Sequence, residues 1–337
     1  MKIIKQNVGI DIAKDSFVST FTVLTEKQDI VFLATKSFKN HIKGFEKLML
    51  WVKKLRDENV KLSFTMEATG VYYESLAFFL FDKEEQVHVV LPNKAKKFGE
   101  SLDIKSKTDK IDSRMLGQMG VERNLRIWKI TSKRLKTIRD YTRERQQLVK
   151  ETTIIKNQIH AEKHKAYPSK KTLTRMKNRL KYIEKQIASV ETDIKKEVAK
   201  DEELASKIKK IMTIPGLGFI TIITVIAETK GFVEITSIKQ LISYAGYDVQ
   251  IRESGKWKGK SRISKKGNSY IRAIMYMPTV SSITHNNVNK QFYERLTKYK
   301  VNGLIALTAL QRKNLGLIYT LWKNDTEFIE NYEAQKG

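Results

Sequence analysis

The sequence predicts an α/β domain at the N-terminus, then a long antiparallel coiled-coil arm, then a mostly helical C-terminal domain. Strand-like and helix-like segments alternate in the first part of the chain. A glycine-free segment with heptad spacing of apolar residues follows, and apolar helices separated by glycine-rich turns come last. We therefore divide the 337 residues into domains at 1–130, 131–210 and 211–337.

The N-terminal domain is expected to begin with three strands. Apolar and polar residues alternate at 3–12, and Val, Phe and Thr are frequent at 17–24 and 30–38, which predicts an antiparallel meander. The next elements are a helix at 41–58, a strand at 60–67, a helix at 72–85, a strand at 86–91 and, after a basic loop, a helix that begins near Asp109. This order indicates a ribonuclease-H-like domain, with a mixed sheet and helices packed on its faces.

The arm is predicted from the apolar pattern of 131–210, which contains one proline, Pro168. Alternating steps of three and four residues join Leu173, Met176, Leu180, Ile183, Ile187, Val190 and Ile194. This heptad pattern predicts a coiled-coil helix, and the segment 166–170 predicts the turn between two antiparallel helices. The arm is either a spacer with solvated charged faces, or an arm for dimerisation or for gripping nucleic acid.

The C-terminal domain contains two segments of functional interest. At 214–228, two glycines precede an apolar helix, and they either present backbone N–H groups to a phosphate or simply close a helical hairpin. A Gly- and Lys-rich segment that starts at residue 250 predicts an exposed loop, followed by a helix that buries Ile271 and Met275. A final core helix is expected at 303–322.

The charge balance indicates a polyanionic partner. Lys and Arg number 64 against 37 Asp and Glu, giving a net charge of +27. Nucleic acid is favoured over a membrane, because no apolar run reaches the roughly 18 residues needed to span a bilayer. The absence of cysteine excludes disulfides, thiolate zinc sites and cysteine nucleophiles. The N-terminal residues lack the pattern of a secretory signal, so we expect a cytoplasmic protein.

Four carboxylates are candidates for a metal site. Asp11 and Glu67 each lie at the end of a predicted strand, and Asp109 and Asp112 are three residues apart on a predicted helix. Strand ends and a helix can bring such groups to one edge of a sheet. Hard oxygen ligands of this kind suit Mg²⁺, which can assist chemistry on nucleic-acid phosphates.

Each of these carboxylates also has an ordinary structural explanation. An Asp after a strand is often a turn former, and an Asp early in a helix often faces the helix dipole. Spacing alone does not distinguish the four from their acidic neighbours Asp15, Glu74, Glu100 and Asp103.

The basic loop supplies candidate nucleophiles and phosphate contacts. Serines occur in it at Ser254, Ser261, Ser264 and Ser269, and the expected phosphate-binding residues are Arg252, Lys256, Lys258, Arg262, Lys265, Lys266 and Arg272. A serine beside glycine in such a loop could attack a phosphate if nearby cations lowered its barrier. From local features alone, hydroxyls that only hydrogen-bond to phosphate are the favoured interpretation.

With these residues in view, nearly the whole chain resembles the DEDD-type transposases of bacterial insertion sequences. This group includes the Piv/MooV invertases and the bridge-RNA-guided recombinases. The N-terminal motifs are VGIDIAKDSF, MEATGVYY and KTDKIDSRML, and the C-terminal ones are IPGLGFITIITVIAE, LISYAGYDV and SRISKKGNSYIRAIMY. The resemblance implies a RuvC-like first domain with an acidic tetrad at Asp11, Glu67, Asp109 and Asp112. It also implies a catalytic serine at Ser254, with Ser269 as the alternative.

The resemblance further implies the reaction and its partners. Serine attack would cut DNA and leave a phosphoserine, with Mg²⁺ (or Mn²⁺) on a tetrad that a partner subunit contributes. Donor DNA, target DNA and a noncoding bridge RNA are the expected partners, and a dimer of dimers is the expected assembly of this nucleoid-associated bacterial protein. A RuvC-like nuclease or junction resolvase without a covalent intermediate is the alternative, and a non-catalytic scaffold is a third hypothesis.

Overall fold

The chain forms two compact units, Met1–Ile130 and Thr131–Gly337. The computed structural model describes residues 2–129, 132–259, 261–299 and 302–330. The expected domain boundary between residues 130 and 131 lies outside the described residues, and the expected boundary at 210 stays a prediction. None of the described helices combines the length and the apolar character that crossing a membrane requires.

The first unit is built on a five-stranded mixed sheet in the order β3-β2-β1-β4-β5. The strands are β1 (Ile3–Ile12), β2 (Ser16–Thr25), β3 (Ile30–Lys39), β4 (Leu62–Glu67) and β5 (Gln86–Val90). β1, β2 and β3 form the expected antiparallel meander, and β4 and β5 join it in parallel. The prediction of a mixed sheet is therefore confirmed.

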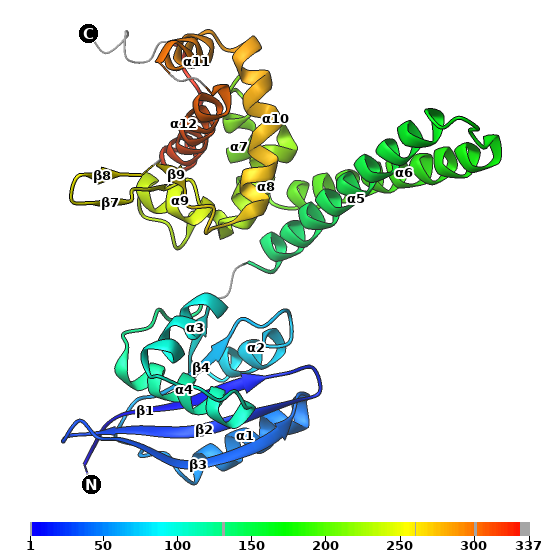
Figure 1. Ribbon diagram of the computed structural model, residues 1–337. Helices are drawn as coiled ribbons and strands as arrows, with labels where there is room; N and C mark the ends of the chain where they lie inside the picture. Colours follow the sequence, from blue (N-terminus) through cyan, green and yellow to red (C-terminus); the bar gives the residue numbers. More distant parts are fainter. Residues whose placement is uncertain (1, 130–131, 260, 300–301, 331–337) are drawn as a thin grey trace. The chain divides into compact units, whose positions relative to one another are not determined.

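Helices cover both faces of this sheet (Figure 1). They are α1 (Ile42–Lys53), α2 (Glu74–Asp82), α3 (Pro92–Ser101) and α4 (Asp109–Glu122). On one face, buried apolar residues such as Val8, Ile10 and Phe64 pack against α1 and α2. On the other face α4 lies across β1 and β2, over polar residues that include Asn7 and Thr20. The unit thus has an apolar layer on one side of the sheet and a partly polar layer on the other.

Helix α3 corrects the expectation of a basic loop after Pro92. Proline is at the first turn of the helix, where its missing N–H costs no hydrogen bond. Ala95 and Phe98 are buried in a small cluster with Met115 and Leu116 of α4. Packing of these few apolar residues stabilises a helix whose other positions are mostly polar and exposed.

In the second unit, α5 (Lys133–Lys163) and α6 (Lys170–Ala199) run side by side (Figure 1). The turn between them falls where the sequence places it. Ile155, Ile159 and Ile183 are buried between the two helices. A third, short helix, α7 (Glu202–Ile211), follows because the carboxylate of Asp201 caps it, accepting the backbone N–H of Leu204 at 3.0 Å. The coiled-coil character of the pair stays a prediction.

The rest of the second unit is mostly helical, as expected. Its elements are α8 (Phe219–Glu228), a 3₁₀ turn η1 (Lys230–Phe232), α9 (Ile238–Ala245), α10 (Ser269–His285), α11 (Asn287–Tyr299) and α12 (Gly303–Asn324). One apolar core joins α8, α9, α10 and α12 to the adjoining parts of α5, α6 and α7. Helix α11 is an addition to the elements that the sequence predicts.

The segment expected as an exposed loop contains four short strands. β6 (Val249–Gln250) pairs with β9 (Arg262–Ile263), and β7 (Glu253–Ser254) pairs with β8 (Trp257–Lys258), both antiparallel. The segment is exposed, as expected, but its tip is an ordered β-hairpin. A hairpin forms here because Gly255, with φ +56°, is the first residue of a two-residue turn that favours glycine.

Candidate active site

Two parallel strands place Asp11 and Glu67 side by side. β1 and β4 are neighbours, and Ile10 is paired with Met66 in their register. Asp11 and Glu67 each follow these paired residues by one position. Because side chains alternate along a strand, both carboxylates lie on the face opposite Ile10 and Met66, which is the α4 face.

Small residues bring α4 directly onto β1. A Cβ built on Gly9 would overlap backbone atoms of Ser113, and a Cβ built on Gly120 would overlap the side chain of Asn7. Ser113 therefore lies over Gly9 and Gly120 lies over Asn7, so α4 runs antiparallel to β1. Its N-terminus is accordingly directed toward the end of β1 that carries Asp11.

The first turn of α4 contributes the other two carboxylates. Thr108 caps the helix, its hydroxyl oxygen accepting the backbone N–H of Ile111 at 3.2 Å. Asp109 and Asp112 are both in this first turn, Asp109 exposed and Asp112 partly buried. Negative charge is favourable there because of the helix dipole, so this position is compatible with a stabilising role and with a metal-binding role.

Electrostatics join the four carboxylates into one cluster. Burial raises the pKa of Asp11 from 3.8 to about 6, and the charges of Asp112, Asp109 and Glu67 add to that rise, while Lys107 opposes it. Burial also raises the pKa of Asp112, again with a contribution from Asp109 and opposition from Lys107. Lys107 therefore offsets only part of the effect that burial and the neighbouring carboxylates have on Asp11 and Asp112.

The cluster suits a divalent cation in its chemistry, but its side chains are not arranged as a closed set of ligands. Across the described parts of the chain, no three His, Cys, Asp or Glu side chains converge closely enough to hold a metal ion. Carboxylate oxygens are the ligands that Mg²⁺ and Mn²⁺ prefer, and a cation would offset both the burial and the repulsion that raise the pKa of Asp11. Side-chain rotation would be needed to bring the four groups to one ion.

The second unit carries the candidate nucleophile, Ser254, at the tip of the β7–β8 hairpin. Ser254 is exposed, and it is paired with Trp257 across the two-residue turn of Gly255 and Lys256. A Cβ built on Gly255 would meet no atom within 4 Å, so the space beside the serine is open. The hydroxyl is thus accessible to a large substrate such as a nucleic-acid strand.

The other serines have different surroundings. The hydroxyl of Ser264 donates to Asp248 Oδ1 at 2.5 Å, which ties the end of β9 to the residue before β6. Ser261 is exposed beside β9, and Ser269 is exposed at the first position of α10. Ser269, the alternative nucleophile, is therefore accessible as well, at a helix start and not at a hairpin tip.

Most of the expected phosphate contacts are exposed. The exposed residues are Arg252, Lys256, Lys258, Arg262, Lys265 and Lys266. Arg272 differs, because its guanidinium donates to the backbone carbonyls of Ala245 at 2.7 Å and Gly267 at 3.1 Å. Arg272 thus holds together the two segments that flank the hairpin, and phosphate binding would compete with that role.

Comparison with known proteins assigns the chain to a family. A model of DEDD transposases of the IS110 group, described as a transposase, matches residues 8–168. A second model, described as the transposase IS116/IS110/IS902 family, matches residues 208–294. The chain belongs to this transposase family. The assignment confirms the resemblance drawn from the sequence motifs, and it makes the protein a DNA recombination enzyme.

Curated relatives align with the transposase over almost its full length. The pilin gene-inverting protein of Moraxella bovis is 26% identical over 330 residues, covering 96% of this chain and 98% of that protein. The pilin gene-inverting protein of Moraxella lacunata is 27% identical over 333 residues, with the same coverage. Among solved structures, T. thermophilus RuvC in complex with a Holliday junction substrate matches 33% of this chain and 90% of its own, with 9% identity and a TM-score of 0.26.

The transposase also contains a buried ion pair that the sequence analysis missed. Arg143 of α5 binds Glu228 of α8 through two hydrogen bonds, Nε to Oε1 at 2.6 Å and Nη2 to Oε2 at 2.9 Å. The Glu228 side chain is 1% exposed, and Asn268 Nδ2 donates to it at 2.6 Å. The sequence does contain a sign of this pair, because Glu228 is an isolated acid at the end of the apolar segment FITIITVIAE. The pair connects α5 to α8, and Asn268, the N-cap of α10, joins it just after the serine-bearing segment 250–267.

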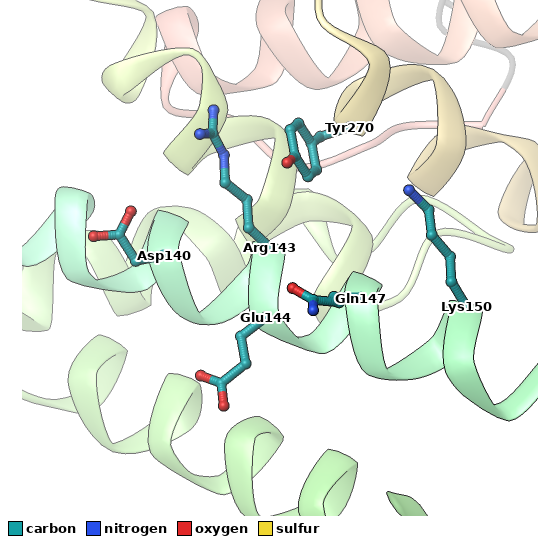
Figure 2. Close-up of a pocket in the computed structure, with 6 residues that line it drawn as sticks. All are labelled: Asp140, Arg143, Glu144, Gln147, Lys150 and Tyr270. Carbon is teal, nitrogen blue, oxygen red and sulfur yellow. The ribbon is translucent and has the colours of Figure 1, made fainter. Parts of the chain in front are cut away.

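A cavity of about 400 Å³ lies beside this ion pair (Figure 2). Its lining residues are Asp140, Arg143, Glu144, Gln147 and Lys150 of α5 and Tyr270 of α10. The Arg143 guanidinium stacks on the Tyr270 ring at 4.5 Å from its centroid. Acidic and basic groups both line the cavity, so it does not select an anion or a cation by charge alone.

Proposed function

We propose that this transposase cuts and rejoins DNA strands through a phosphoserine at Ser254, with Mg²⁺ held by Asp11, Glu67, Asp109 and Asp112. The observation that supports the metal site most strongly is the raised pKa of Asp11, to which the other three carboxylates contribute. Four acids that repel one another inside a chain of net charge +27 are well explained by a cation that binds among them.

The chemistry follows from the residue types. The Ser254 hydroxyl loses its proton as its oxygen attacks phosphorus. The new P–O bond replaces the P–O bond to the sugar, and the sugar oxygen takes up a proton and leaves as a hydroxyl. Because a phosphodiester replaces a phosphodiester, the energy of the bond is conserved and the strand can be rejoined without ATP. Bound Mg²⁺ would supply electrostatic stabilisation of the charge that develops on the phosphate oxygens.

The basic residues of the serine-bearing segment would hold the strand in place. Arg252, Lys256 and Lys258 flank Ser254 on the hairpin, and all are exposed. Each phosphate that they neutralise releases counterions, so binding should weaken steeply as salt increases. Arg262, Lys265 and Lys266 would extend this contact, and Arg272 would support the segment through its hydrogen bonds to backbone carbonyls.

Guidance by a noncoding bridge RNA and assembly as a dimer of dimers complete the proposal. A protein that holds one RNA and both donor and target DNA must neutralise many phosphates, and the net charge of +27 supports that requirement. RNA that co-purifies with the expressed chain, and loss of strand exchange after ribonuclease treatment, would be the expected results.

A metal-dependent nuclease or resolvase is the competing function, because the acidic cluster lies entirely in the first unit and could activate water. Ser254→Ala distinguishes the two in a DNA cleavage assay with Mg²⁺ or Mn²⁺. We expect the variant to form no protein–DNA adduct and to leave DNA uncut, with Ser261→Ala as the matched control on an exposed serine of the same segment. Cleavage that persists in Ser254→Ala would favour the resolvase.

A further inference from the structure

Trp257 is the residue directly opposite Ser254 on the hairpin. The two are paired across the β7–β8 turn, and Trp257 is 60% exposed. Directly paired residues of an antiparallel ladder have Cβ atoms roughly 5 Å apart. A large aromatic side chain in solvent, next to the proposed nucleophile, has no explanation in the packing of the unit.

The exposed indole ring of Trp257 lies close to the backbone of Gly259. A Cβ built on Gly259 would meet the indole Cη2 at 2.6 Å and Cζ3 at 3.1 Å. The six-membered ring therefore lies over the backbone of Gly259, which has room for it only because it is glycine. Contact with Gly259 limits the positions that the ring can take on that side, which reduces the ordering needed when a base binds.

The charge around the ring suits a nucleic-acid strand. Lys256 and Lys258 are the neighbours of Trp257 along the chain, and Arg252 is on the adjoining strand side; all three are exposed. An exposed aromatic ring on a hairpin that also carries exposed cations is a combination by which proteins bind single strands, since the ring stacks on a base and the cations contact the backbone.

We propose that Trp257 is a binding site for an unpaired nucleobase of the DNA strand that Ser254 cuts. The base would stack on the indole, which would fix the neighbouring phosphate beside the serine. The proposal rests on the proposed function for its choice of strand. Stacking does not read base identity, so the site would take any base that is unpaired at the cut.

The test measures binding of the full-length chain to two fluorescent probes, a single DNA strand and the same backbone made of abasic residues. Both carry the same charge, so only stacking separates them. The wild type should bind the base-containing strand more tightly, and Trp257→Ala should remove that preference, a loss of about 5- to 150-fold. Trp257→Phe should keep part of it.

Gly259→Ala is the sharper variant because it keeps the tryptophan but displaces its ring. The added methyl group occupies the position of the ring, so the preference for bases should fall although the charge and the indole are unchanged. Tyr167→Ala is the matched control, since Tyr167 is 92% exposed beside lysines at the turn between α5 and α6. It should bind both probes as the wild type does.

Three results would overturn the proposal. They are an undiminished base preference in Trp257→Ala, an equal loss in Tyr167→Ala, and a base preference that appears only with an RNA strand of the same sequence. Ser254→Ala should keep the full preference, because binding needs no chemistry. A failed phosphoserine assay with an intact base preference would therefore count against the proposed function alone. A phosphoserine that forms without any base preference would count against the role of Trp257 alone.

Discussion

Asp11 and Glu67 occupy equivalent positions on parallel neighbouring strands, each one residue beyond the register pair Ile10–Met66. The backbone pairing of β1 and β4 therefore places both carboxylates on one face of the sheet, whichever rotamers the side chains adopt. α4 then adds Asp112 and Asp109, because glycine at position 9 lets the helix lie on the strand. The cluster is a consequence of strand register and of one close helix–sheet contact.

The first prediction concerns Asp11→Asn in metal-free protein. The folded pKa of Asp11 is about 6 and the ordinary value is 3.8, so the folded state holds this proton more tightly. The stability that this tighter proton binding contributes is fully present below pH 4 and is lost as the pH rises through about 6. Asp11→Asn should therefore unfold at a higher temperature than the wild type at pH 8. Since the group is partly exposed, the gain is about 1 kcal/mol.

Thermal unfolding at pH 4 and pH 8 checks this prediction. The advantage of Asp11→Asn should be present at pH 8 and absent at pH 4, where both side chains are neutral. Asp29→Asn is the control, because Asp29 is an exposed carboxylate of the same unit. It should leave the unfolding temperature unchanged at both pH values. A variant less stable than the wild type at pH 8 would contradict the unfavourable burial and repulsion of the Asp11 charge.

The second prediction concerns divalent metal. If Mg²⁺ or Mn²⁺ binds the folded state as proposed, it should stabilise the wild type at pH 8 by about 2.7 kcal/mol at a concentration 100 times the dissociation constant, and the unfolding temperature should rise. The same addition should have little effect on Asp11→Asn or Glu67→Gln. Calorimetric titration near pH 6 should also detect proton release, because the cation displaces the proton of Asp11. Equal stabilisation of all three proteins would place the metal elsewhere.

The third prediction concerns the close contact between α4 and the sheet. A Cβ on Gly117 would overlap Thr22 Oγ1, a side chain that can be shortened, whereas a Cβ on Gly9 would overlap backbone of α4. Gly117→Ala should cost about 1–3 kcal/mol and reduce strand exchange, and adding Thr22→Ala should restore part of both. Thr22 Oγ1 is buried without a hydrogen bond, so its removal costs little in itself.

Two further variants make this test specific. Gly9→Ala should be as harmful and should not be rescued by Thr22→Ala, since its clash is with backbone. Gly99→Ala in α3 is the matched control, because its Cβ would meet only Met115 Cγ at 3.9 Å. Rescue of Gly9→Ala by Thr22→Ala would contradict this account of how the helix is seated.

The fourth prediction concerns the ion pair of Arg143 and Glu228. Arg143→Met would leave a nearly fully buried carboxylate without its main partner and should cost about 3–5 kcal/mol. Adding Glu228→Leu should recover much of that loss. Lys156→Met is the control, since its partner Glu184 is 3.6 Å away on an exposed surface and the change should be within about 0.5 kcal/mol. Unfolding in denaturant measures all of these, and a double variant no better than Arg143→Met would refute the explanation.

Much of the first unit could be predicted because its local signals agree with one another. Strand ends that carry Asp11 and Glu67 follow apolar runs, and the spacing of Asp109 and Asp112 predicts a shared helix face. The parallel pairing of β1 with β4 decides that these groups share a face, and that pairing joins segments more than 50 residues apart. The sequence therefore suggests that the carboxylates converge, and the register of β1 and β4 determines that Asp11 and Glu67 do so.

Other features depend on packing that the sequence does not display. Helix α3 has only Ala95 and Phe98 buried, so its apolar face is narrow and the segment resembles a basic loop in composition. The hairpin at Ser254 consists of two-residue strands in a run of charged and small residues, where alternation is absent. Arg143 and Glu228 are 85 residues apart, and neither position indicates its partner.

Ser254 is the proposed nucleophile, and peptide mapping of a covalent protein–DNA complex tests that role most directly. The full-length chain is incubated with Mg²⁺ and DNA that carries its insertion-element ends, then denatured, digested and examined by mass spectrometry for a serine bearing a nucleotide. We expect the nucleotide on the peptide that contains Ser254, and no adduct from Asp11→Asn. A nucleotide on Ser269, or efficient cleavage with no adduct on any serine, would contradict the account.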